Sequence, residues 1–300
     1  MNTKLLKESV IKAVFFAAAL SSIIIVFYII GEVAYVGWPQ VSSWVTNGFG
    51  MKWQPSAIEG QGVYGIIPYM FSTTYAGVGA ILIGALIGLP CAIYLAEFSN
   101  EKLRNIVKPA LEMLTGFPSV VIGLVGFTLL CATLYKYLGP PGTTMLAAWL
   151  VLGIMSLPTI ASISEDALRA VPQDQREAAL GLGATKWQTT TRVLLPGAKS
   201  GIAAALLLAL GSAMGETMAV IMVVGAIQNP PITLNPYVNS GVFTGIINAG
   251  ANPDNPTLQY KQAIYAAGLI LFVIVAMLNL VTRRVLSGTK ISGISRSPKP

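Results

Sequence analysis

Six stretches of the chain are almost purely apolar, and each is long enough to cross a bilayer as a helix. A helix needs about 20 apolar residues to span the hydrocarbon core. The apolar residues run continuously here, whereas a transmembrane β-barrel would alternate them with polar residues. The pattern therefore predicts an all-α polytopic membrane bundle of about six transmembrane helices. The predicted spans are residues 13–36, 67–96, 107–134, 144–164, 201–227 and 262–285.

Lys and Arg residues gather in alternate loops, and this bias predicts the orientation. All but three of the 19 Lys and Arg residues fall on one side of the predicted spans, and the exceptions are Lys52, Lys136 and Lys261. Short loops rich in Lys and Arg stay in the cytoplasm. We therefore expect a multi-pass protein of the cell membrane with both termini cytoplasmic. The net charge of +7 is then a topology signal and not a nucleic-acid footprint.

The predicted spans divide the chain into three parts. Residues 1–66 hold the first span and an outer loop, and residues 67–285 form the membrane core. Residues 286–300 are a Ser-, Pro- and Lys-rich cytoplasmic tail that we expect to be disordered. The first span follows three Lys, as a secretory signal would, but its apolar run of about 24 residues is longer than the core of such a signal. We expect this span to be retained.

The composition argues against an enzyme. There is no His, and Cys91 and Cys131 lie in apolar spans, where thiols usually behave as small hydrophobic groups. This removes the usual zinc, copper and haem sites and most acid–base chemistry that relies on imidazole. The chain also has no P-loop, because Ala198 precedes Lys199 where a phosphate cradle needs Gly. We expect no catalytic residues, no metal and no cofactor.

Two outer segments have patterns of their own. Trp38, Trp44 and Trp53 follow the first span, where we expect them to anchor the chain at the level of the lipid headgroups. Residues 228–261 are rich in Asn, Pro and Gly. Their mildly apolar middle, residues 237–247, is expected to form a short re-entrant or interfacial helix.

The most informative hydrophilic segment is the long inner loop of residues 165–199. Pro172 can open a helix there, and glycines weaken that helix after two turns. Thr185 can cap a second short helix, which we expect to end before Pro196. The loop is therefore predicted to form a helix, a bend at Gly183 and a second helix.

Residues 177–196 of this loop read EAALGLGATKWQTTTRVLLP, and two alanines there give a slim helix face that another protein can approach closely. The segment resembles the EAA signature of ABC importer membrane subunits, which has Glu-Ala-Ala, a Gly four residues later and then Leu-Pro. The resemblance implies a type I importer permease fold whose loop couples to separate ATP-binding subunits. The matching residues are Glu177, Ala178, Ala179, Gly183, Leu195 and Pro196.

Glu216 lies about fifteen residues into the fifth predicted span, where an unpaired charge costs roughly 2.5–3.5 kcal/mol or more. The residues at helical spacing around it are small, so its face permits a close helix contact or a narrow water-filled path. These residues are Ala209, Ser212, Ala213 and Ala219. Both a structural carboxylate and a transport-path residue fit this pattern.

The sequence around Glu216 resembles phosphate-importer permeases of the PstC type. Residues 210–225 read LGSAMGETMAVIMVVG, 116–121 read GFPSVV and 92–97 read AIYLAE, within a likeness that runs from about residue 60 to residue 284. The translocation-path residues that this resemblance implies are Pro118, Ser119, Ser212, Glu216 and Thr217.

One position departs from that family's pattern. Its members carry an Arg four residues before the Glu, where Ser212 stands here. Either a partner subunit supplies the cation, or Glu216 is protonated in an apolar site, or the substrate is not phosphate. We favour the first alternative, in which Glu216 orients a partner Arg instead of touching phosphate.

The resemblance as a whole implies a non-catalytic permease subunit of an ATP-driven importer for inorganic phosphate. The implied partners are a second homologous permease subunit, two ATP-binding cassette subunits, an external phosphate-binding protein and the lipid bilayer. One alternative is the same machinery with another oxyanion, such as tungstate, molybdate or sulfate. A secondary transporter or a membrane-embedded enzyme is the other alternative, and it lacks the paired interrupted spans or the catalytic constellation that it would need.

Overall fold

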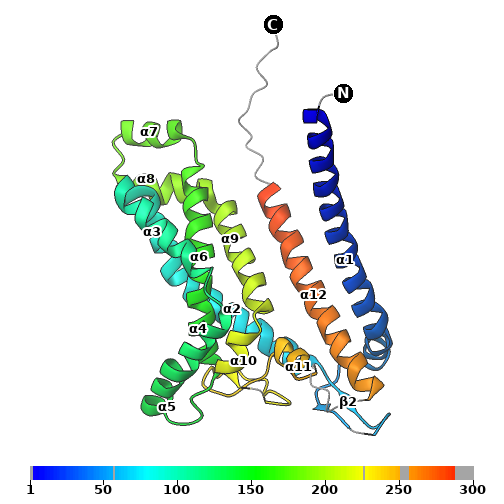
Figure 1. The fold of residues 1–300 in the computed structure, drawn as a ribbon. Helices are drawn as coiled ribbons and strands as arrows, with labels where there is room; N and C mark the ends of the chain where they lie inside the picture. The colour runs from blue at the N-terminus through cyan, green and yellow to red at the C-terminus, as the bar shows by residue number, and fades with distance from the viewer. Residues whose placement is uncertain (1–2, 57, 226, 251–256, 288–300) are drawn as a thin grey trace.

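The computed structural model describes residues 3–56, 58–225, 227–250 and 257–287, which form helices running between two ends of the molecule (Figure 1). Six of the described helices are long and apolar enough to cross a membrane, as the sequence predicts. They are Glu8–Asn47, Ile67–Phe98, Ser119–Leu138, Met145–Arg169, Lys186–Gly215 and Leu258–Val285. Beyond Ser287, the tail that was expected to be disordered lies outside the described residues.

The elements are helical almost throughout, apart from one small hairpin in which Trp53 pairs with Tyr64 across antiparallel strands. Three of the spans contain a π-helical turn. The elements are α1 (Thr3–Asn47), β1 (Trp53–Gln54), β2 (Val63–Tyr64), α2 (Ile67–Ile93), a π turn (Tyr94–Phe98), α3 (Glu101–Leu114), α4 (Ser119–Val125), a π turn (Gly126–Cys131), α5 (Ala132–Leu138), α6 (Met145–Arg169), α7 (Gln173–Gly181), α8 (Lys186–Thr189), a π turn (Thr190–Leu194), α9 (Leu195–Gly215), α10 (Met218–Val224), α11 (Phe243–Gly250) and α12 (Leu258–Ser287).

The helix α6 lies at the centre of the bundle, packed against α2 and α9, while α1 and α12 pair at its edge (Figure 1). Small side chains let the central helices approach closely, because each removes bulk from the contact. Ala76 and Ala80 of α2 and Ala148 of α6 are buried in this core. The apolar part of α1 buries none of its side chains within the chain, as expected for a helix that faces lipid.

The two ends of the bundle carry different elements. The start of α1, the end of α12 and the helices α7 and α8 lie at one end, and the hairpin, α5 and α11 lie at the other (Figure 1). An even number of spans brings the two ends of a chain to the same side. The inner loop of residues 165–199 is therefore at the same end as both ends of the described chain.

The third span differs from its prediction, which placed one helix over residues 107–134. Residues 101–114 instead form α3, a separate amphipathic helix without a buried residue, and the span begins at Ser119. The break falls at Gly116 and Pro118, because a proline disfavours helical geometry in the residue before it. The apolar face of α3 makes the two helices look like one run in the sequence.

The fifth span is also interrupted where one helix was predicted over residues 201–227. The helix α9 ends at Gly215, and the backbone of Glu216 is extended, with φ −68° and ψ 131°. The chain becomes helical again at Met218, where α10 begins. Glu216 therefore lies at a break between two helices and not within a continuous helix.

The tryptophans of the first outer loop differ from one another. Trp38 is 63% exposed, as an interfacial anchor would be, but Trp44 and Trp53 are only 3% and 2% exposed. The prediction that all three are anchors was therefore wrong for two of them. Trp44 donates its indole N–H to the Tyr64 carbonyl at 2.7 Å, and Trp53 packs edge-on against Tyr64. These residues form an aromatic core at the end of the bundle that carries the hairpin.

The last outer loop contains the short helix that the sequence predicts, although it starts later than expected. The predicted segment was residues 237–247, and α11 covers Phe243–Gly250. Phe243 and Ile246 are buried against the aromatic core, so this helix packs on the protein.

Candidate functional site

The inner loop forms a helix that lies across the ends of the spans (Figure 1). Pro172 precedes the first turn of α7, and Asp174 lies within that turn, where the partial positive charge of a helix N-terminus favours a carboxylate. The helix ends at Gly181. This confirms the first half of the predicted helix, bend and helix.

The bend is at Gly183, whose φ of +83° is in the left-handed region that favours glycine. Thr185 then caps α8 in a reciprocal arrangement with Gln188. The Thr185 hydroxyl accepts from the Gln188 N–H at 3.2 Å, and the Gln188 side chain accepts from the Thr185 N–H at 2.9 Å. The cap was predicted from the sequence and is confirmed.

The end of the second helix was predicted wrongly. The chain does not leave the helix before Pro196 but continues from α8 through the π turn at Thr190–Leu194 into α9. A π turn directly before the proline lets the helix pass a residue that has no N–H to donate. Lys186–Gly215 is therefore one continuous helical span.

The loop presents apolar side chains at this end of the molecule. Leu182 is 90% exposed, and Leu180 and Trp187 are also exposed. Exposed apolar groups clustered among polar ones mark a protein interaction surface. Of the residues that match the EAA signature, Glu177, Ala178, Gly183 and Pro196 are exposed, and Ala179 and Leu195 are half-buried.

A cluster of charged residues lies beneath the loop, and the sequence analysis did not identify it. Arg176 of α7 approaches Glu97 at 2.8 Å. Glu165 of α6 is fully buried, and its two oxygens accept from Arg104 at 2.8 Å and from Lys108 at 2.7 Å. Burial lowers the pKa of Lys108, but its hydrogen bonds to the neighbouring carboxylates outweigh this and raise the pKa above its ordinary value.

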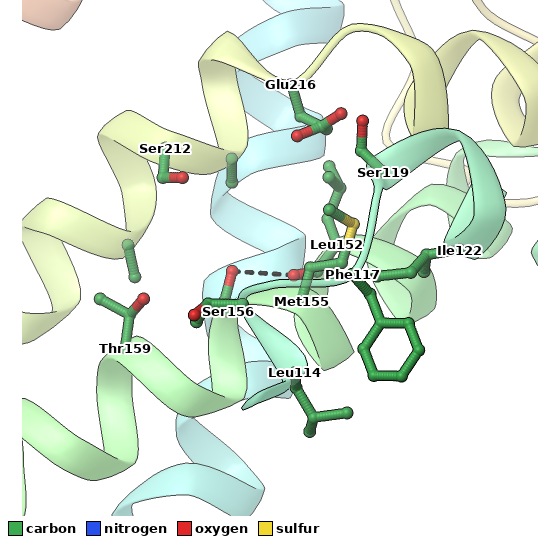
Figure 2. A pocket seen from close by; sticks show the side chains of 13 residues that line it. Leu114, Phe117, Ser119, Ile122, Leu152, Met155, Ser156, Thr159, Ser212 and Glu216 are labelled. Atoms are coloured by element: carbon green, nitrogen blue, oxygen red, sulfur yellow. Dashed lines mark hydrogen bonds between the residues drawn. The ribbon is translucent and has the colours of Figure 1, made fainter. Parts of the chain in front are cut away.

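A cavity of about 280 Å³ opens between α4, α6 and α9, beside both helix breaks (Figure 2). The side chains of Glu216 and Ser119 lie near one another on its wall. Ser212, which also lines the cavity, precedes Glu216 by about one helical turn. The polar residues that line the cavity are Thr115, Ser119, Ser156, Thr159, Ser212 and Glu216. Its lining among the described residues contains one carboxylate, several hydroxyls and no cationic side chain.

The two helix breaks position the polar residues of this cavity. Pro118 precedes α4 and places Ser119 at the start of that helix, while the extended backbone of Glu216 ends α9. Thr244 donates to the Glu216 carbonyl at 3.0 Å, which satisfies a backbone oxygen that no helix uses. Irregular backbone at membrane depth is tolerated where it lines a cavity or is buried in protein.

Three of the five predicted path residues line the cavity, namely Ser119, Ser212 and Glu216. Pro118 and Thr217 are not among the lining residues but flank the two breaks. The cavity is also lined by Thr115, Ser156 and Thr159, which were not predicted from the sequence. Ser156 and Thr159 are three residues apart on α6, and this spacing could have indicated a common helix face.

The fold and these two sites define the class of this protein, a polytopic membrane permease. A chain of a bacterial alginate ABC transporter, solved in complex with its alginate-bound periplasmic protein, aligns over 94% of this chain and 95% of its own with a TM-score of 0.60 and 15% identity. An inward-facing methionine ABC transporter, MetNI, gives a TM-score of 0.58 at 20% identity over 74% of this chain and 95% of its own. At these identities the likeness shows the fold.

Residues 88–291 match the family described as the binding-protein-dependent transport system inner membrane component, and the chain belongs to this family. A probable ABC transporter permease protein, YqgH of Bacillus subtilis (strain 168), is 31% identical over 86% of this chain and 84% of its own. The phosphate transport system permease protein PstC of Pasteurella multocida (strain Pm70) is 33% identical over 80% of each chain.

Proposed function

We propose that this chain is the non-catalytic transmembrane permease subunit of an ATP-driven importer that moves inorganic phosphate inward. The observation that carries the proposal is the match to phosphate transport permeases over most of the chain. The permease core in this proposal, residues 67–285, contains the polar cavity and also the exposed loop, which lies at one end of the bundle. Residues 1–66 add the lipid-facing first span and its outer loop.

The exposed inner loop is the surface through which ATP hydrolysis acts. Glu177, Ala178 and the apolar Leu182 face away from the spans, where a separate ATP-binding subunit can dock. We place two such subunits, a second homologous permease and an external phosphate-binding protein in the complex. The end that carries the loop is cytoplasmic in this proposal, because the Lys and Arg bias favours that side.

The cavity around Glu216 is the part of the translocation path that this subunit contributes. Hydroxyls such as Ser119 and Ser212 can exchange hydrogen bonds with an oxyanion as it loses water. Glu216 by itself would repel an anion, and no cation lines the described cavity. The second permease therefore supplies an Arg, and Glu216 orients it.

The direct test is uptake by the reconstituted complex. Proteoliposomes that contain the permease pair, the ATPase subunits and the phosphate-binding protein should show ATP-dependent, vanadate-sensitive uptake of labelled phosphate. Uptake by this chain alone would refute a subunit role. If unlabelled sulfate, molybdate or tungstate competed with phosphate and was itself taken up at the higher rate, the substrate assignment would be replaced by that oxyanion.

A further inference from the structure

The coupling helix α7 is joined to the membrane spans at one polar contact. The Nη2 atom of Arg176 lies 2.8 Å from Oε1 of Glu97, in the last turn of the span that begins with α2. Among the described residues, this is the only ion pair or hydrogen bond between an α7 side chain and a span. The helix α7 also packs against the first turns of the span Lys186–Gly215, but a movement of α7 reaches the span Ile67–Phe98 through Glu97.

Glu97 lies where four helical segments converge. Its carboxylate is only 9% exposed, and besides Arg176 it experiences the positive charges of Arg169 on α6 and Lys186 on α8. The carboxylate is the anionic centre among cations from three other elements. A displacement of any one of these cations changes the total electrostatic attraction on the carboxylate, because charges interact strongly where water is excluded.

The contact between Arg176 and Glu97 is incomplete in this conformation. The Nε atom of Arg176 is buried and has no hydrogen-bond partner among the described residues, and Oε1 of Glu97 lacks a well-aligned donor. An Arg–carboxylate pair is strongest when two N–H groups donate to the two oxygens in parallel. A reorientation of α7 that brought Nε onto the carboxylate would satisfy both groups. The pair can therefore change strength when α7 moves.

A second set of ion pairs lies between α6 and α3, on the side of the cavity. Arg169 Nε lies 3.7 Å from Oε1 of Glu165, which also binds Arg104 and Lys108 of α3. The last residue of α3, Leu114, lines the cavity. These ion pairs thus link α6 to the helix that reaches the wall of the cavity, and the charge of Arg169 connects them to Glu97 by Coulomb attraction.

We propose that Glu97 and Arg176 form a coupling latch. They are positioning residues that transmit the movement of α7 to α2 and α6, and their hydrogen bonding differs between the ATP-free and ATP-bound states. The latch rests on the proposed function, in which α7 docks on an ATP-binding subunit.

The first experiment measures phosphate taken up per ATP hydrolysed in proteoliposomes. Glu97→Gln and Arg176→Gln should each lower this ratio about tenfold while hydrolysis and co-purification of the ATPase persist. The double variant should be no worse than either single variant, since all three lack the same contact. Arg176→Lys, which keeps the charge but not the two-bond geometry, should fall between wild type and Arg176→Gln. Glu101→Gln, an exposed carboxylate nearby, is the matched control.

Two outcomes for the ratio of phosphate taken up to ATP hydrolysed would overturn the latch. One is a wild-type ratio in both single variants, and the other is a double variant whose loss is the sum of the two single losses. Loss of ATPase co-purification in the single variants, with no change in the ratio of the complex that remains, would also count against it. That result would assign the pair to assembly.

The second experiment needs no transported substrate. After Cys91 and Cys131 are replaced by Ala, the variant Ser212→Cys places one reactive thiol in the cavity. Its labelling by a membrane-impermeant maleimide should change on addition of ATP and vanadate with the latch intact, but not with Glu97→Gln. If the wild-type complex took up no phosphate, only the substrate assignment would be refuted. If the ATP-dependent change in labelling persisted in the Glu97→Gln variant, the latch would be refuted.

Discussion

Nε of Arg104 on α3 donates a hydrogen bond to Oε1 of the fully buried Glu165 on α6 at 2.8 Å. Lys108, one turn further along α3, donates to the other oxygen of Glu165 at 2.7 Å. The helix α3 buries none of its own residues. Its attachment to the bundle therefore relies on polar contacts, of which these reach the most buried partner, and the attachment positions the end of α3 that lines the cavity.

We expect Glu165→Gln to destabilise the protein by about 1–3 kcal/mol, because two cations that are mostly shielded from water lose a charged acceptor. Thermal unfolding of the purified protein in detergent measures this change. The neighbouring Asp166→Asn is the control, since Asp166 is exposed and its surface pair with Lys108 should contribute about 0–1 kcal/mol. Equal losses for both variants would contradict the attachment role of Glu165.

Gly183 and Gly181 allow a matched test of the bend in the inner loop. Gly183→Ala should disfavour the native bend by about 1–2 kcal/mol, because a residue with a Cβ is strained at a φ of +83°. No atom lies close enough to clash with the added methyl group, so the cost arises from the backbone alone. Gly181 is helical and equally open, so Gly181→Ala should be neutral or slightly stabilising. Co-purification of the ATPase subunit and coupled ATP hydrolysis should fall for the first variant only. A similar loss for Gly181→Ala would show that size, not backbone geometry, matters.

The sequence predicted features that arise from local chemistry. The apolar runs gave six spans, and the order of Pro172, Gly183 and Thr185 gave a helix, a bend and a capped helix. These patterns act within a few residues, and their physics is visible without a fold.

The features that the sequence did not predict depend on contacts between distant segments. Glu97 and Arg176 are far apart in the chain, and nothing in either segment indicates that they meet. The break at Glu216 has no proline, and the Thr244 hydroxyl that satisfies its carbonyl comes from another helix. Trp53 looked like an interfacial residue because its burial depends on aromatic rings from α2 and α12.

Trp53 and Trp38 should respond differently to truncation. Trp53→Ala removes a buried ring that contacts Tyr64, Tyr69 and Tyr260 edge-on and should cost about 3–5 kcal/mol. Trp38→Ala removes an exposed ring and should change the free energy of unfolding by about 0.5 kcal/mol or less. Melting temperatures in the same detergent check this pair. A larger loss for Trp38→Ala than for Trp53→Ala would contradict the role of Trp53 in a buried aromatic core.

Glu216→Gln provides the sharpest test of the cavity. The substitution keeps the size of the side chain and one acceptor oxygen but removes the charge that would orient a partner Arg. Uptake of phosphate should fall at least about tenfold, while the variant still assembles with the second permease and the ATPase. Glu216→Asp, which retains the charge on a shorter side chain, should lose less.

The control for this test is Glu112→Gln. Glu112 is an exposed carboxylate of α3 that accepts a hydrogen bond from Ser162 and does not line the cavity. The Glu112→Gln variant should therefore take up phosphate at close to the wild-type rate. Because a helix break places Glu216 at the cavity without any cation in the described lining, unchanged uptake and assembly in Glu216→Gln would remove the carboxylate from the path. The hydroxyls of Ser119, Ser156 and Ser212 would then be the groups of this subunit that meet the substrate.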